Sequence, residues 1–262
     1  MNRTPISLPL SCIPEEFHSL LHDAKVFDSS CSRQAKVYFV DRDDGYYLKS
    51  SPAGTLKTEA EMTRFFHKKS LGAQVLSYIN ALDRDWLLTR RVPGEDCTLH
   101  KYLDDPQRLS VTLAVHLRKL HEISFSGCPV ADRMVSYRET VERNYRHGMY
   151  DHSLFPDNWG FTSAEEAIAQ ARICMPDFQS SVLIHGDYCL PNIMLNDWQF
   201  SGFIDVGNGG VGDRHIDLFW GIWSLAFNLK TTAYTERFLS AYGSDLIERE
   251  MLRGVAACEV FG

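Results

Sequence analysis

Two stretches of sequence decide the fold: His185-Gly186-Asp187-Tyr188-Cys189-Leu190-Pro191-Asn192 and, a little further on, Phe203-Ile204-Asp205. The first follows the apolar run VLI, which is typical of a short buried strand. It therefore places an aspartate and an asparagine, five positions apart, on the polar loop after that strand. The second places another aspartate at the end of the next predicted β-hairpin.

The side chains of Asp187, Asn192 and Asp205 are the kinds of group that phosphoryl transfer needs. One carboxylate orients the attacking hydroxyl and accepts its proton, while an amide oxygen and a second carboxylate hold Mg²⁺ against the phosphates. The protein kinase pattern, H-R-D with a later asparagine and then D-F-G, has the same spacing. We therefore predict Asp187 as the base and Asn192 and Asp205 as the metal ligands. An isolated H-G-D triplet could instead be a turn in which the aspartate caps a backbone amide, but the second aspartate favours catalysis.

The two halves of the chain differ in their predicted secondary structure. Alternating and β-branched runs predict strands at 35–40, 45–50, 74–79 and 85–90, with one helix at 58–69. After the turn at Val92-Pro93-Gly94, apolar residues recur every three or four positions. The later predicted elements are helices at 106–122, 135–146 and 164–173, a strand within 182–187, a hairpin of 192–195 with 200–205, and helices from 213 onward. This pattern predicts an α+β fold with a small β-rich N-terminal lobe (residues 1–92) and a larger, mainly helical C-terminal lobe (residues 93–262).

Composition limits the class of protein. Of the 262 residues 44% are hydrophobic, which is ample for a packed core. The seven cysteines form no C-x-x-C pair, so neither a zinc site nor a disulfide framework is expected. The formal charge of −7 argues against nucleic acid as a partner and is compatible with a cationic substrate. The chain contains no bilayer-length apolar run and no signal-like start, so we expect a soluble cytoplasmic protein.

The motifs H-G-D-x-C-L-P-N-I-M, F-S-G-F-I-D-x-G and x-D-R-x-x-D together resemble those of the aminoglycoside 3′-phosphotransferases, which share the protein kinase-like fold. Further segments fall in that family's order: V-P-G-x-D at 92–96, L-R-x-L-H at 117–121, C-P at 128–129 and M-P-D at 175–177. The resemblance implies a bilobal fold, ATP or GTP as phosphoryl donor, Mg²⁺, and O-phosphorylation of an aminoglycoside antibiotic, which would confer resistance.

The resemblance also assigns nucleotide-binding residues. Lys49 matches the lysine that contacts the α- and β-phosphates, although most lysines at strand ends are merely solvated. Its partner would be an acidic residue on the next helix, and counting along that helix favours Glu59 over Glu61. The stretch from Arg90 to Val92 matches the connection between the lobes, where main-chain groups bind the edge of a purine.

The chain departs from the family in two loops. The nucleotide-covering loop at 30–35 has no glycine, and Arg33 falls where a serine is expected, so the serine contact would come from Ser32, one place earlier. After Asp205 the family usually has Gly-Arg, whereas this chain has Asn208 in place of the arginine. Two polar residues are predicted to be structural rather than catalytic: His185, and Asp217, which would accept backbone hydrogen bonds near the catalytic loop.

The acceptor-binding residues match the family least well. In the family, the helix after the equivalent of Asp217 carries acidic residues, but residues 218–228 here contain no carboxylate and are rich in aromatic residues. Such a helix could be plain core, or it could suit a more apolar acceptor. The remaining candidates for acceptor binding are Asp157 with Asn158, and Glu259 with the C-terminal carboxylate at Gly262.

Three functions therefore stay open. The first is an aminoglycoside O-phosphotransferase. The second is a related kinase for another small hydroxylated metabolite or antibiotic, which the missing arginine and missing acidic helix favour. The third is a nucleotide-binding pseudokinase, which the intact Lys49, Asp187, Asn192 and Asp205 disfavour.

Overall fold

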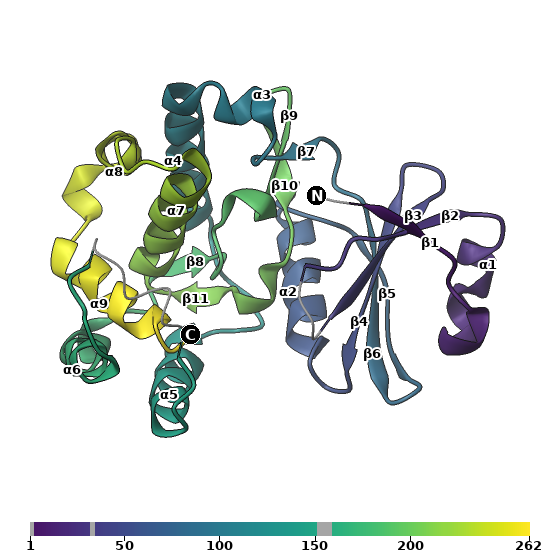
Figure 1. Ribbon diagram of the computed structural model, residues 1–262, viewed down its shortest axis with the longest axis horizontal. Helices are drawn as coiled ribbons and strands as arrows, with labels where there is room; N and C mark the ends of the chain where they lie inside the picture. Colours follow the sequence, from purple (N-terminus) through teal and green to yellow (C-terminus); the bar gives the residue numbers. More distant parts are fainter. Residues whose placement is uncertain (1–2, 32–34, 151–158) are drawn as a thin grey trace. The chain divides into compact units, whose positions relative to one another are not determined.

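The computed structural model describes residues 3–31, 35–150 and 159–262, which form two compact units (Figure 1). The first unit comprises Met1–Asp96 together with Pro191–Gly207, and the second comprises Cys97–Leu190 together with Asn208–Gly262. The first is rich in β-structure and the second is mainly helical, as the sequence predicted. The first unit extends past residue 92 and also takes in a hairpin that is distant in sequence, because that hairpin pairs with residues just after the predicted boundary.

The first unit is built on a six-stranded sheet in the order β1-β2-β3-β4-β6-β5 (Figure 1). All five pairings are antiparallel; β4 pairs with β6, and β5 forms the edge of the sheet beyond β6, with helix α2 between β4 and β5 in sequence. The strands are β1 (Thr4–Ile6), β2 (Lys25–Asp28), β3 (Lys36–Asp41), β4 (Tyr46–Pro52), β5 (Val75–Ala81) and β6 (Arg84–Arg90).

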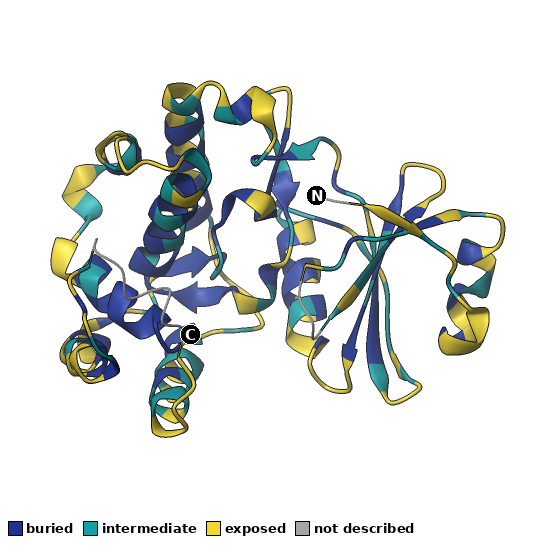
Figure 2. Ribbon diagram, viewed as in Figure 1, coloured by how far each residue is buried: buried dark blue, intermediate teal, exposed yellow. Residues whose placement is uncertain are grey.

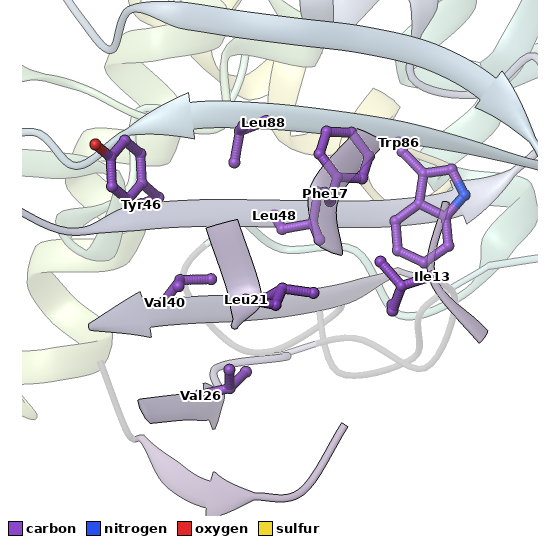
Figure 3. Close-up of a cluster of buried hydrophobic side chains, with 9 residues drawn as sticks. All are labelled: Ile13, Phe17, Leu21, Val26, Val40, Tyr46, Leu48, Trp86 and Leu88. Atoms are coloured by element: carbon purple, nitrogen blue, oxygen red, sulfur yellow. The ribbon is translucent and has the colours of Figure 1, made fainter. Parts of the chain in front are cut away.

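One face of this sheet carries the hydrophobic core of the unit (Figure 3). Because side chains alternate between the faces of a strand, Tyr46 and Leu48 of β4 point to this core, as does Trp86 of β6. The core is closed by Phe17 and by Leu21 of the short helix α1 (His18–Leu21). The alternate residues of β4, Tyr47 and Lys49, are left for the opposite face.

Helix α2 (Lys57–Lys68) covers that opposite face. Ala60 of the helix packs with Leu87, which pairs directly with Lys49 across the β4–β6 ladder. The start of the helix is fixed by Asp85, whose buried carboxylate accepts a hydrogen bond from the Leu56 N–H at 2.9 Å. The helix and Lys49 therefore lie on the same side of the sheet.

A second, three-stranded sheet in this unit has the order β10-β9-β7, formed by β7 (Glu95–Asp96), β9 (Ile193–Asn196) and β10 (Gln199–Phe203). The β9–β10 hairpin turns at Asp197 and Trp198, which both have left-handed backbone angles, as in the tight turns that suit twisted hairpins. Gly94 has φ +88°, and an added Cβ there would lie 2.2 Å from the Leu195 carbonyl oxygen. Only glycine therefore allows the chain before β7 to approach β9 this closely.

The second unit surrounds a short, fully buried antiparallel pair, β8 (Val182–Ile184) with β11 (Gly210–Gly212) (Figure 2). Aspartate residues cap the N-termini of three of its long helices: the side chains of Asp105, Asp132 and Asp213 each accept a hydrogen bond from a first-turn N–H. The helices are α3 (His100–Leu103), α4 (Pro106–Glu122), α5 (Arg133–Arg146), α6 (Ala164–Cys174), α7 (Arg214–Leu229), α8 (Thr235–Tyr242) and α9 (Arg249–Glu259). Within the described residues, no helix has the length and apolar character needed to cross a membrane.

Candidate active site

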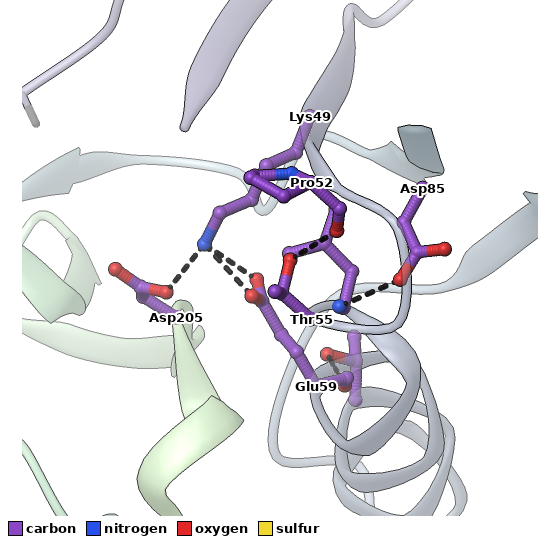
Figure 4. Close-up of polar contacts among 8 residues, drawn as sticks. Lys49, Pro52, Thr55, Glu59, Asp85 and Asp205 are labelled. Atoms are coloured by element: carbon purple, nitrogen blue, oxygen red, sulfur yellow. Dashed lines mark hydrogen bonds and ion pairs between the residues drawn. The ribbon is translucent and has the colours of Figure 1, made fainter. Parts of the chain in front are cut away.

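Lys49 is the centre of an ion-pair cluster in the first unit (Figure 4). Its ammonium donates to both carboxylate oxygens of Glu59, at 2.9 and 2.8 Å, and to Oδ1 of Asp205 at 2.8 Å. Burial opposes the charge on Lys49, but the two carboxylates outweigh it, so the pKa of the ammonium is raised. Lys49 is therefore a fixed positive charge held between two anions.

The partner of Lys49 is the one that the sequence favoured. Glu59 is half-buried in the first turn of α2 and reaches Lys49, whereas Glu61 is exposed. This follows from the helical repeat of 3.6 residues: two positions correspond to a rotation of about 200°, which turns Glu61 to the opposite side of the helix. The pairing of Lys49 with Glu59 is thus confirmed, while the nucleotide role of both residues remains a prediction.

The backbone segments that carry the two predicted metal ligands, Asn192 and Asp205, are hydrogen-bonded to each other. The Ile204 N–H donates to the Asn192 carbonyl oxygen at 3.0 Å, which holds the residue before Asp205 against Asn192. Asp205 has φ +58°, a conformation that is uncommon for residues other than glycine and often marks functional sites. Its side chain is about half exposed (52%), so its carboxylate can reach a ligand.

The donor set fits Mg²⁺. Among the described residues, no group of three or more His, Cys, Asp and Glu side chains gathers as a metal site. Mg²⁺ prefers hard oxygen ligands and is usually held by one or two carboxylates together with substrate phosphates and water. The amide oxygen of Asn192 and the carboxylate of Asp205 match that chemistry, and the Lys49 ammonium is bonded to Asp205.

A small apolar cluster lies in the same unit, beside the predicted base-contacting stretch. Ala73, Val92 and Met194 are buried together, with Ile204 packed against them. The backbone N–H of Arg90 donates to the Gln74 carbonyl and so is engaged within the fold. In the described part of the chain, the N–H and C=O of Val92 make no hydrogen bond. Of the two predicted base-contacting positions, Val92 therefore has the better-placed main chain.

In the second unit, Asp217 of α7 holds the loop that carries Asp187. The fully buried carboxylate of Asp217 accepts the N–H groups of His185 and Gly186, both at 2.7 Å. Gly186 has φ +81°, and an added Cβ would lie 2.0 Å from the Asn208 carbonyl oxygen, so this position of the H-G-D motif requires glycine. The predicted structural role of Asp217 is confirmed.

Two further side chains complete the network around Asp217. His121 Nε2 lies 3.2 Å from Asp217 Oδ2, and His121 Nδ1 lies 2.8 Å from the Tyr242 hydroxyl. Because the carboxylate can only accept, His121 donates from Nε2 and accepts the Tyr242 proton at Nδ1. His185 is itself buried, with Nδ1 accepting from the Asp187 N–H at 3.3 Å. Its predicted packing and hydrogen-bonding role is therefore consistent with the structure.

Glu259, the predicted acceptor contact in the C-terminal segment, is a buried carboxyl group on α9. The Tyr137 hydroxyl donates to its Oε1 at 2.9 Å, and only 6% of the residue is exposed. Burial raises the pKa of Glu259 to about 7; the Tyr137 hydrogen bond opposes this rise and the charge of Asp187 adds to it. Glu259 thus shares an electrostatic environment with the predicted base.

Helix α7, whose aromatic residues the sequence left open between core and acceptor contact, contributes to the core and also reaches the surface. Leu218, Phe219 and Leu225 of α7 are buried core residues. Trp223 and Phe227 are stacked on the outer side, with ring centroids 5.1 Å apart and an angle of 8° between the planes. Phe227 is 56% exposed, so the helix also presents an aromatic surface.

Three predicted site residues, Ser32, Asp157 and Asn158, lie outside the described residues. Conversely, sequence reasoning gave no role to Tyr137 or Tyr242, which contact Glu259 and His121. Neither tyrosine lies in a motif, and their partners are more than 120 positions away, at 122 and 121 residues. His121 could have been noticed, because it ends the L-R-x-L-H segment.

The fold and these side chains define a kinase-type phosphotransferase. Residues 24–255 match the phosphotransferase enzyme family, APH. The chain therefore belongs to this family, and the resemblance to aminoglycoside 3′-phosphotransferases seen in the sequence is confirmed. It is accordingly an enzyme of the transferase class.

The relatives agree along the whole chain. A probable aminoglycoside 3′-phosphotransferase of Lactococcus lactis is 44% identical over 262 residues, covering 100% of this chain and 99% of the relative. An aminoglycoside 3′-phosphotransferase of Niallia circulans is 28% identical, covering 92% and 94%. Among solved structures, an aminoglycoside-3′-phosphotransferase of type VIII has a TM-score of 0.73 at 23% identity, covering 90% and 91%, which confirms the predicted protein kinase-like fold.

Proposed function

We propose that the protein moves the γ-phosphoryl group of ATP or GTP onto a hydroxyl of an aminoglycoside antibiotic. The observation that carries the proposal is the cluster of Lys49 with Glu59 and Asp205, since kinases require this lysine–glutamate pair beside a metal-binding aspartate. Relatives named as aminoglycoside 3′-phosphotransferases support the choice of acceptor. A structural neighbour from Streptomyces rimosus was solved with ADP and streptomycin (TM-score 0.69, 22% identity, covering 86% of this chain and 90% of that one).

The first unit binds the donor in this proposal. Lys49 contacts the α- and β-phosphates, and Glu59 keeps its ammonium in place. Asn192 and Asp205 hold Mg²⁺, which would offset the negative charge of the phosphates. The purine ring of the nucleotide lies among Ala73, Met194 and Ile204, and the Val92 main chain binds the edge of that ring. Arg90 and Ser32 complete the proposed nucleotide contacts. The predicted nucleotide-binding lobe, residues 1–92, is thus joined in this role by the Pro191–Gly207 segment of the same unit.

The second unit supplies the catalytic base, Asp187. Asp187 accepts the proton of the acceptor hydroxyl while the oxygen of that hydroxyl forms a bond to the γ-phosphorus. The bond from that phosphorus to the bridging oxygen breaks, and its electron pair leaves with the nucleoside diphosphate. Asp217 keeps the loop of Asp187 in position by taking the two N–H groups at 2.7 Å. General-base assistance of this kind typically contributes about 10²–10⁴-fold in rate.

The acceptor is a cation in this proposal. Glu259, together with Asp157 and Asn158, binds its protonated amino groups. An ionised Glu259 beside Asp187 would attract such groups, and a net charge of −7 is consistent with a cationic ligand and with no role for nucleic acid. Because the donor is a cellular nucleotide, we expect the reaction to take place in the cytoplasm, with no membrane partner.

A second candidate is a kinase for another small hydroxylated compound. It is favoured by α7, which presents Trp223 and Phe227 in place of carboxylates. The experiment that decides is an acceptor panel: purified protein with Mg-ATP or Mg-GTP is offered kanamycin, a macrolide and an amino alcohol, and products are identified by ³¹P NMR. Phosphorylated kanamycin supports the main proposal, and transfer only to other acceptors supports the second. Tight Mg-nucleotide binding without transfer would indicate a pseudokinase.

A further inference from the structure

Arg133, the first residue of α5, is tied to the loop that follows the metal-ligand segment. Its Nη2 donates to the Asn208 side-chain oxygen at 3.0 Å. Asn208 occupies the position at which the family usually has an arginine. A guanidinium is nevertheless present at this place, but it comes from a residue 75 positions earlier in the chain.

Asn208 in turn touches the catalytic loop. Its carbonyl oxygen packs against Gly186 so closely that an added Cβ would lie 2.0 Å away. The hydrogen bond from Arg133 therefore braces Asn208 against the residue that precedes Asp187. The start of α5 is itself fixed, because the Asp132 carboxylate accepts both the Met134 N–H at 3.0 Å and the Ser180 hydroxyl.

The same helix also reaches Glu259. Arg133 and Tyr137 are four residues apart, so they lie on one face of α5, one turn from each other. The Tyr137 hydroxyl donates to Glu259, and the charge of Arg133 lowers the pKa of the Glu259 carboxyl. Burial lowers the pKa of the Arg133 guanidinium, and the charge of Glu259 opposes that effect. The face of α5 that holds Glu259 therefore also brings a positive charge to it.

We propose that Arg133 is a positioning residue of the acceptor side of the site: it holds Asn208 against the loop of Asp187 and offsets the negative charge of Glu259. This inference rests on the proposed function in so far as Glu259 binds the acceptor. Because Arg133 lowers the pKa of the Glu259 carboxyl, it favours the charged form of Glu259 near neutral pH. A cationic acceptor then meets the negative charge of Glu259 over a wider pH range.

Several groups face Glu259 and together set its charge. The Tyr137 hydroxyl and Arg133 come from α5, and Trp220 comes from α7. Asp187 comes from the loop after β8. On α9 itself, Cys258 is buried and its thiol pKa is raised well above the usual value, so it stays neutral. Of the groups just named, Arg133 is the cation, so its removal should raise the pKa of Glu259.

The acceptor experiment compares Arg133→Ala, Arg133→Lys and Arg143→Ala. Arg143 is exposed on the same helix and serves as the control. The KM for kanamycin is measured between about pH 6 and pH 9 and divided by the wild-type value, which cancels the titration of kanamycin itself. In Arg133→Ala the pH at which KM falls should move up by about one unit, since removing an opposite charge shifts a carboxyl by that order. Arg133→Lys should restore most of the profile, and the control should match wild type.

A second measurement needs no acceptor. Urea unfolding of wild type, Arg133→Ala and the double variant Arg133→Ala/Glu259→Gln is followed across the same pH range. If Arg133 offsets the charge of Glu259, Arg133→Ala should lose stability more steeply than wild type as pH rises, and the double variant should not. Equal slopes for wild type and Arg133→Ala would overturn the proposal, as would a KM change that is independent of pH. If the wild type transfers no phosphoryl group but Arg133→Ala still loses stability more steeply with rising pH, the proposed function is wrong and the role of Arg133 beside Glu259 stands.

Discussion

Replacing the buried carboxyl of Glu259 by an amide should change how the stability of the protein depends on pH. Glu259→Gln keeps the size of the side chain and an oxygen that can accept the Tyr137 hydroxyl, which lies at 2.9 Å in the structure. It removes the charge. We expect the variant to be more stable than wild type at alkaline pH.

The magnitude follows from the pKa of Glu259, which rises from 4.5 to about 7 on folding. This shift of about 2.5 units, at about 1.4 kcal/mol per unit, corresponds to roughly 3.5 kcal/mol. The folded protein binds the proton more tightly than the unfolded chain does. The stability that this group contributes is therefore full below about pH 4.5 and is lost progressively as pH rises through about 7.

The assay is urea unfolding of wild type, Glu259→Gln and Glu250→Gln at about pH 5 and about pH 8.5. Glu250 is exposed on the same helix, so its variant controls for the chemical change alone. The free energy of unfolding of wild type relative to Glu259→Gln should fall by roughly 2–3 kcal/mol between the two pH values, while Glu250→Gln should follow wild type. A difference between wild type and Glu259→Gln that stays constant with pH would refute the reasoning, because Glu259 would then not be held in a buried environment.

Three further predictions concern the catalytic groups and their support. Asp187→Ala should reduce kcat by about 10²–10⁴-fold, because the proton acceptor is lost, and leave the nucleotide Kd near that of wild type; normal turnover in a product assay would remove Asp187 from its role. Asn192→Ala should raise the Mg²⁺ concentration needed for half-maximal rate, measured by metal titration, since an oxygen ligand is removed; an unchanged requirement would contradict the metal assignment. Tyr242→Phe should destabilise the protein by about 1–3 kcal/mol in urea unfolding, because the buried Nδ1 of His121 loses its donor; unchanged stability would show that this hydrogen bond is not formed.

Much of the site could be predicted because its parts are short in sequence. The strand before His185 and the hairpin before Asp205 are local structures, and their apolar patterns identify them. The choice of Glu59 over Glu61 came from the resemblance to the family, and the helical repeat then excludes the second residue, because the two lie on opposite sides of the helix. The lysine that Glu59 pairs with is only 10 residues away.

Other parts could not be predicted, because they depend on which distant segments pack together. The sequence placed the division of the chain at residue 92. The structure groups Pro191–Gly207 with the first unit, because β9 pairs with β7. A strand of two residues, Glu95–Asp96, gives no pattern by which that pairing could be recognised.

The sequence by itself determined the type of chemistry, because an aspartate, an asparagine and a second aspartate at fixed spacing after buried strands need only local structure to be recognised. It also determined the α+β class through hydrophobic periodicity. Only the tertiary structure decided the electrostatics around those groups. The contacts of Glu259 with Tyr137, and of Arg133 with Asn208, join residues 122 and 75 positions apart. The charge of a buried group depends on which side chains surround it and on how far water is excluded, and packing sets both.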